Sequence, residues 1–117
     1  MKLMCNNKIV AELQYIDNMP YMVLRRGLDF MDVPYGLFSE LGTPEIFLDK
    51  ITYEKFMDWV EDRCMPKERV DCDEVLKRFG FSEYNRAELT YMTQAVMTCQ
   101  DHFWVDFEDG RGNPIKW

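Results

Sequence analysis

Hydrophobic and polar positions alternate through the first quarter of the chain, which is the spacing typical of β-strands. Residues 2–5 and 8–15 carry this pattern on either side of Asn6-Asn7. Asparagine tolerates the positive φ of tight hairpin turns, so the two stretches predict a β-hairpin. A second turn at residues 17–20 leads to a third predicted strand at residues 21–24.

The spacing changes to that of a helix in the middle of the chain. Residues 53–64 place apolar side chains at i, i+3, i+4 and i+7, with charged residues on the other side. Thr52 provides a cap at the start, and Pro66 stops the helix. This stretch therefore predicts an amphipathic helix.

Two further helices are predicted by their boundary signals. Asp71 and Asn85 each precede a glutamate by three residues, which is the capping-box spacing. They open helices over about 72–79 and 86–99, and Gly80 closes the first of them.

Two shorter segments complete the expected elements. Residues 43–50 begin with Thr-Pro-Glu, a helix-start signal that predicts one short helix. Residues 102–108 return to a period of two, with Phe103 and Val105 on one face and Trp104 on the other. They predict a last strand that rejoins the N-terminal sheet.

These elements predict an α+β fold in a single domain, residues 1–117. A small antiparallel sheet from residues 2–24 and 102–108 is covered on one face by about three helices. The predicted core residues are Phe56, Val60, Leu76, Phe79, Leu89, Met92, Val96, Phe103 and Val105.

The net negative charge of the chain makes some classes of binding partner unfavourable. Fourteen Lys and Arg against 21 Asp and Glu give a formal net charge of −7, which opposes contact with the phosphates of nucleic acid. The acidity serves either solubility or attraction to a basic protein surface. No apolar run approaches the about 18 residues of a membrane span. The expectation is a cytoplasmic protein without direct nucleic-acid or membrane contacts.

The cysteine and histidine residues do not have the spacing of a typical metal site or catalytic site. Cys99 and His102 have the only zinc-like spacing, and no paired C-x-x-C knuckle accompanies them. A Cys–His nucleophile needs an exposed thiol in electropositive surroundings, whereas Asp101 lies between these two residues. The four cysteines are dispersed and are expected to be reduced thiols. We expect no catalytic residue, metal or cofactor.

The helix predicted at residues 53–64 carries the candidate binding residues. Glu54, Asp58 and Glu61 share one helical face, and Asp62 extends it. Trp59 lies off the main apolar stripe, so it either widens that stripe or stands exposed as an interface anchor. The predicted partner-binding set is Glu54, Asp58, Trp59, Glu61 and Asp62.

A resemblance begins at Phe56. The pattern Phe56-x-x-Trp59, Arg63-x-x-Pro66-x-x-Arg69, Leu76, Gly80 and Asp101-x-Phe103-Trp104-Val105 resembles a module that precedes the kinase domain in HipA-type toxin kinases, with stand-alone relatives on bacterial mobile elements. It covers about half of the chain, and we expect no kinase lobe to accompany it. The resemblance implies a non-catalytic regulatory module, with Arg63 and Arg69 as structural or interface residues.

Small size and acidity also resemble phage anti-defence inhibitors of the anti-CRISPR type, which bind basic nuclease surfaces. Two functions are therefore expected of a phage or mobile-element protein. The first is inhibition or regulation of a larger host protein, such as a nucleic-acid-handling complex. The alternative is a toxin–antitoxin accessory module that binds a HipA-like kinase.

Overall fold

The main element of the fold is a five-stranded sheet in the order β6-β3-β2-β1-β7, with every neighbouring pair antiparallel. The computed structural model describes residues 1–40, 43–97 and 101–114, with the backbone alone at residues 40 and 43–46. The strands are β1 (Lys2–Cys5), β2 (Lys8–Ile16), β3 (Met19–Leu24), β6 (Lys50–Thr52) and β7 (Phe103–Asp106). The predicted α+β class, N-terminal hairpin and returning C-terminal strand are confirmed, since β7 pairs with β1.

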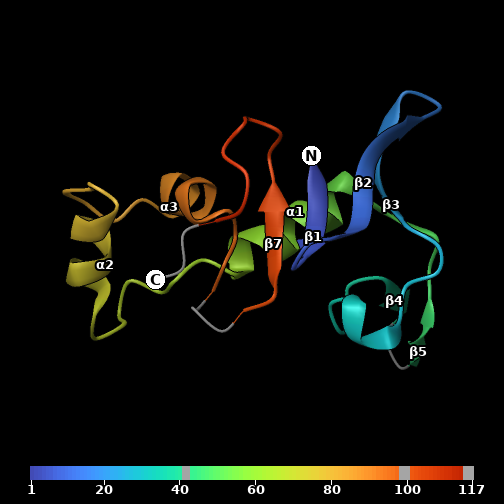
Figure 1. Ribbon diagram of the computed structural model, residues 1–117, viewed down its shortest axis with the longest axis horizontal. Helices are drawn as coiled ribbons and strands as arrows, with labels where there is room; N and C mark the ends of the chain where they lie inside the picture. Colours follow the sequence, from blue (N-terminus) through green and yellow to red (C-terminus); the bar gives the residue numbers. More distant parts are fainter. Residues whose placement is uncertain (41–42, 98–100, 115–117) are drawn as a thin grey trace.

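The hairpin turns form where asparagine and aspartate allow a positive φ. Asn6 has φ 51° in the β1–β2 turn, and Asp17 and Asn18 have φ 51° and 66° between β2 and β3. Two consecutive positive values match the right-handed twist of the flanking strands. The β2–β3 hairpin extends beyond the rest of the sheet (Figure 1).

Helix α1 (Tyr53–Asp62) lies across one face of this sheet (Figure 1). The Thr52 hydroxyl caps it by accepting a hydrogen bond from the Lys55 amide at 3.2 Å, as predicted. Phe56 and Val60 point into the core. There they join side chains from all five strands, among them Leu3, Val10, Met22, Ile51 and Val105.

The opposite face of β1 and β7 has its own small cluster. Trp104 is 5% exposed and packs with Met4 and Val96, while its indole N–H donates to the Asn6 carbonyl at 2.9 Å. The period-two pattern correctly predicted that the side chains of Trp104 and Val105 lie on opposite faces of the strand. It did not indicate that the chain after α3 covers this second face.

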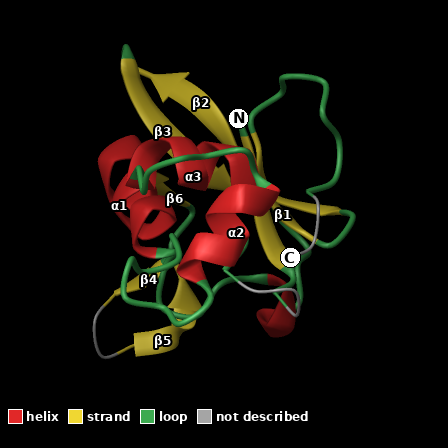
Figure 2. Ribbon diagram, turned by 90° about the vertical axis from the view of Figure 1, so that its left-hand side faces the viewer, coloured by secondary structure: helices red, strands yellow, loops and turns green. Residues whose placement is uncertain are grey.

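Helices α2 (Cys72–Arg78) and α3 (Arg86–Thr93) lie beyond the β7 side of the sheet (Figures 1 and 2). Of the three helices, α1 is the one that crosses the sheet face. A second apolar cluster joins α2 to α3, and its buried members are Cys64, Met65, Cys72, Val75, Leu76 and Leu89.

The predicted helix at residues 43–50 is wrong. This region forms β5 (Thr43–Phe47), which pairs with β4 (Ser39–Glu40), followed by β6 at the sheet edge. Phe47 stacks on Phe30 of the short 3-10 helix η1 (Phe30–Asp32), with ring centroids 6.0 Å apart. Pairing with distant segments therefore overrides the local helix-start signal.

The helix predicted at residues 86–99 ends early. Asn85 caps α3 as expected, with its side chain accepting from the Glu88 amide at 3.0 Å. The helix stops at Thr93 because Gln94 and Ala95 both have positive φ, 54° and 62°. Val96 consequently leaves the helical face and reaches the cluster around Trp104.

Several smaller predictions have mixed outcomes. Met92 is 40% exposed, so placing it in the core was wrong. Asp71 makes no side-chain cap and pairs with Arg69 instead, at 2.5 Å. Phe79 and Phe103 are half-buried, and the remaining predicted core residues Phe56, Val60, Leu76, Leu89, Val96 and Val105 are buried.

In the described parts of the chain, no helix has the length and apolar character needed to cross a membrane.

Candidate protein-binding surface

Helix α1 presents one acidic face to solvent. Glu54, Asp58, Glu61 and Asp62 are all exposed, while Phe56 and Val60 anchor the opposite side in the core. Among the described residues, none of the four carboxylates forms an ion pair. The face is therefore a row of free negative charges on a helix whose position is fixed by packing.

One cation lies at the C-terminal end of this row. Arg86, the first residue of α3, is close enough to Asp62 for that carboxylate to help raise the pKa of the guanidinium, after the larger effect of a hydrogen bond with Tyr84. At the start of the row, the exposed Lys55 offsets part of the charge, and Glu54 also interacts favourably with the positive end of the helix dipole. Four carboxylates against Lys55 and the nearby Arg86 leave the face with a net negative charge.

Trp59 widens the apolar stripe and is not an exposed anchor. It is half-buried, packs against the main core and stacks on Phe56 with ring centroids 6.0 Å apart. The Arg63 guanidinium lies over its ring, 4.5 Å from the centroid, a distance at which a cation is attracted to an indole face. Trp59 thus supports the acidic face from beneath.

Arg63 joins α1 to the chain that follows α3. Its side chain is 11% exposed, forms an ion pair with Asp101, and donates from Nε to the Ala95 carbonyl at 2.9 Å. Burial lowers the pKa of Arg63 to about 10, so it stays protonated at neutral pH. The Asp101 carboxylate also accepts from the amides of Met97 and Phe103, at 3.0 and 3.1 Å.

Three residues of the sequence pattern that resembles the HipA-type module therefore meet in space. Trp59, Arg63 and Asp101 form one cluster between α1 and β7. Their observed role is structural, because none of them projects freely into solvent.

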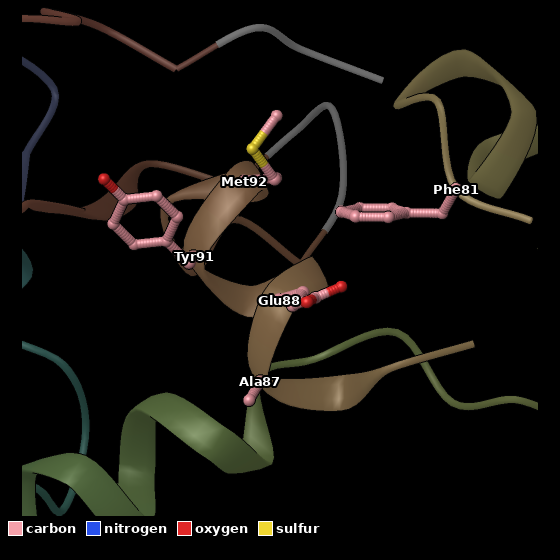
Figure 3. A pocket seen from close by; sticks show the side chains of 5 residues that line it. All are labelled: Phe81, Ala87, Glu88, Tyr91 and Met92. Atoms are coloured by element: carbon pink, nitrogen blue, oxygen red, sulfur yellow. The ribbon is translucent and has the colours of Figure 1, made fainter. Parts of the chain in front are cut away.

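A groove runs beside α3. Its volume is 420 Å³, it is open to solvent, and it is lined by Phe81, Ala87, Glu88, Tyr91 and Met92. In Figure 3, Phe81 points from the chain after α2 toward α3, and the C-terminal end of α1 lies next to Ala87. The groove therefore adjoins the end of the acidic face.

The loop after β7 holds Tyr91 in place. The Tyr91 hydroxyl donates to the Asp109 carboxylate at 2.6 Å, and its ring contacts Phe107 with centroids 5.1 Å apart. The Arg111 guanidinium lies 4.3 Å from the centre of the Tyr91 ring and pairs with Asp109 at 2.7 Å. These hydrogen bonds raise the pKa of Tyr91 and lower that of Asp109.

One feature of the sequence does point to this groove. Helix α3 has apolar residues on two sides, with Leu89 facing the second cluster and Ala87 and Tyr91, four apart, facing outward. This second apolar side lines the groove.

The residues considered for metal or thiol chemistry do not converge in the described part of the chain. His102 is exposed and its Nδ1 lies 3.3 Å from the Asn6 side-chain oxygen, while Cys99 is outside the described residues. Among described residues no group of three or more His, Cys, Asp or Glu side chains is placed to hold a metal ion. Cys5 and Cys72 are buried free thiols, and burial raises their pKa, which lowers the reactive thiolate fraction.

No protein-family model, curated protein or solved structure was found to match this chain.

Proposed function

We propose that this protein is a non-catalytic binding protein that docks the acidic face of α1 onto a basic surface of a larger protein and thereby regulates or inhibits it. The supporting observation is the row of four exposed carboxylates, which form no ion pair with any described residue, on a helix packed against the core. Such a row steers a positively charged partner during encounter and selects against acidic ones.

The proposed partner class is a nucleic-acid-handling protein of a bacterial cell, and the proposed origin is a phage or mobile element. Proteins that bind phosphate backbones carry clustered Lys and Arg. An acidic face docked on such a cluster competes with nucleic acid for the same charges. This mode of inhibition requires neither a cofactor nor a catalytic residue.

The test starts from a pull-down in a bacterial host, followed by mass spectrometry and binding kinetics with the captured protein. The association rate is expected to fall steeply with added salt, because steering is screened beyond about 8 Å at physiological ionic strength. Reversing Glu54, Asp58 and Glu61 to lysine is expected to lower that rate by about tenfold or more. A rate that responds neither to salt nor to the reversal would leave the face as solubilising surface.

The matched control reverses three exposed carboxylates that lie outside α1, namely Asp49, Glu68 and Glu74. It changes the net charge by the same amount, so it separates the local face from overall acidity. Its association rate is expected to stay closer to that of the wild type than to that of the α1 variant.

A second candidate function is a toxin–antitoxin accessory module that binds a HipA-like kinase. The observation that favours it is the meeting of Trp59, Arg63 and Asp101, which links distant parts of the resembling pattern in one structural cluster. Co-expression with a HipA-like kinase tests it: this function requires a stable complex and a change in toxicity. A captured nuclease complex with blocked DNA binding favours the inhibitor instead.

A further inference from the structure

The groove beside α3 is suited to a side chain presented by another protein. At 420 Å³ it has the size of a small-molecule pocket. Small-molecule sites, however, enclose most of their ligand and bring several polar groups together, whereas this groove is open and mainly apolar, with Glu88 as its one charged lining residue. An open apolar groove instead suits an anchor side chain of a partner protein, because the partner itself covers the side of the groove that is open to solvent.

Its walls combine rigid and adaptable parts. Tyr91 is fixed by Asp109, Phe107 and Arg111 before any partner arrives, so little side-chain entropy is lost on binding. Met92 is unbranched and 40% exposed, and methionine adjusts its shape to different apolar partners. An ordered aromatic beside a flexible thioether is typical of a protein-binding surface.

The charges around the groove select the partner. A neighbouring hollow shares Phe81 and Glu88 with the groove and adds Glu83, so two carboxylates and no cation line the combined surface in the described chain. Two arginines lie beside the lining residues: Arg111 is paired with Asp109, whereas Arg86 keeps its positive charge, because its hydrogen-bond partner Tyr84 is neutral. Glu83, Glu88 and Asp109 outnumber these two cations, so the rim is weakly negative, and the adjoining end of α1 adds further carboxylates.

We infer that this groove is the docking site for a segment of the partner protein that inserts one aromatic or long aliphatic side chain flanked by lysine or arginine. The inference rests on the proposed function for the basic character of the partner. It adds a second contact: the α1 face attracts the partner, and the groove holds its anchor.

The test uses the whole chain and defined probes. Three capped pentapeptides, KKWKK, EEWEE and KKGKK, are titrated into ¹⁵N-labelled protein. KKWKK is expected to shift the amide signals of Ala87, Glu88, Tyr91 and Met92, with a Kd at least about tenfold below those of the other two peptides.

Variants link the binding to the groove. Met92→Lys and Ala87→Arg are both expected to raise the Kd of KKWKK by about tenfold or more, the first by placing a cation in the apolar wall and the second by filling the groove with one. Met31→Lys is the matched control, because Met31 is 81% exposed and lies in η1, away from the groove. Circular dichroism confirms that each variant is folded.

Several outcomes would overturn the inference. Equal binding of EEWEE removes the charge selection, and binding of indole alone as tight as KKWKK makes the groove a small-molecule site. If the wild type dimerises and Met92→Lys abolishes the dimer, the groove is assigned to a second copy of the chain. If KKWKK shifts only amide signals of α1, and the groove variants do not change these shifts, the groove inference fails while the proposed function stands. If KKWKK shifts the groove signals, but reversing the α1 carboxylates does not change the association rate with the partner, the groove inference stands and the proposed α1 docking face fails.

Discussion

The sheet and the helical end of this molecule are stabilised in different ways. The cluster beneath α1 draws side chains from all five strands of the main sheet, from the segment at residues 33–38 and from Ala95, so it unites distant parts of the chain. The cluster between α2 and α3 draws all its buried members from residues 64–89. Specific polar contacts surround it, including the Tyr84 hydroxyl donating to the Met65 carbonyl at 2.6 Å. The groove lies at this second, more local end.

The two candidate contact regions therefore differ in how firmly the surrounding structure supports them. The acidic face belongs to the helix that is packed on the sheet, whereas one wall of the groove belongs to a chain segment stabilised by a small cluster. Segments with fewer buried apolar contacts open locally at lower free energy than the global transition. The groove is therefore expected to adapt more readily than the α1 face.

The largest effect is expected from deleting a large side chain in the main core. Phe56→Ala removes a fully buried ring and is expected to lower the free energy of unfolding by about 3–5 kcal/mol. Leu76→Ala in the second cluster is expected to cost about 2 kcal/mol, because the shallower site collapses more easily. Urea denaturation measures both. Equal losses would erase the contrast between the two clusters.

A slightly smaller effect is expected at the ion pair that connects the two regions. Asp101→Asn leaves the Arg63 charge buried without its partner and is expected to cost about 3 kcal/mol, the lower end for a broken buried pair, because Trp59 and the Ala95 carbonyl still contact the guanidinium. The double variant Arg63→Met, Asp101→Asn removes that charge and is expected to recover part of the loss. A cost below about 1 kcal/mol for the single variant would mean that the pair does not link the regions.

Tyr84→Phe tests the stability of the helical end without changing the main core. It removes the hydroxyl that donates to the Met65 carbonyl and lies 3.7 Å from the Cys64 sulfur. The expected loss is about 1–2 kcal/mol, since a half-buried carbonyl is left without its donor. Hydrogen exchange is expected to show faster exchange in α2 and α3 with little change in β2. A uniform increase through the sheet would contradict the local character of this end.

The smallest effect is expected when the pH is lowered, because two carboxylates of the loop after β7 then lose their contribution to stability. The Tyr91 hydroxyl bond lowers the pKa of Asp109 below its usual 3.8, and the N-terminal ammonium lowers that of Glu108 below its usual 4.5. Depressed carboxylate pKa values contribute stability that is fully present above the usual values and is lost as the pH falls through the folded-state values. Thermal unfolding between pH 6 and about 3 is expected to show a small loss, reduced in Asp109→Asn. An Asp109→Asn curve parallel to that of the wild type would refute the contribution.

Sequence reasoning was most accurate where local chemistry determines local structure. Asparagine at the turns and as the cap of α3, threonine as the cap of α1, and Gly80 after α2 all behave as predicted, because their side chains or φ values act within a few residues. The acidic face also follows from helical spacing alone, and it is exposed as expected.

The rest could not be predicted because it depends on distant contacts. The Thr-Pro-Glu start at residues 43–45 is locally a good helix opening, yet pairing with β4 makes it a strand. Helical spacing leaves two orientations open for Trp59, and the structure resolves them through Arg63, which lies over the indole ring and pairs with the distant Asp101. The groove depends on how the chain after α2 packs against α3, and no pattern within α3 specifies that arrangement.

The outer edge of β7 is largely closed to backbone pairing. Alternate residues of an edge strand direct their backbone groups outward, and here Asp101 accepts from the Phe103 amide at 3.1 Å while the Gln94 carbonyl accepts from the Val105 amide at 2.8 Å. The Gln94 side-chain amide also donates to the Val105 carbonyl at 3.4 Å. In the described part of the chain, the outward amide of Phe103 and both backbone groups of Val105 are therefore already bonded, which hinders fibril-like stacking and strand addition by a partner at this edge. Recognition on this side then depends on the shape and charge of side chains.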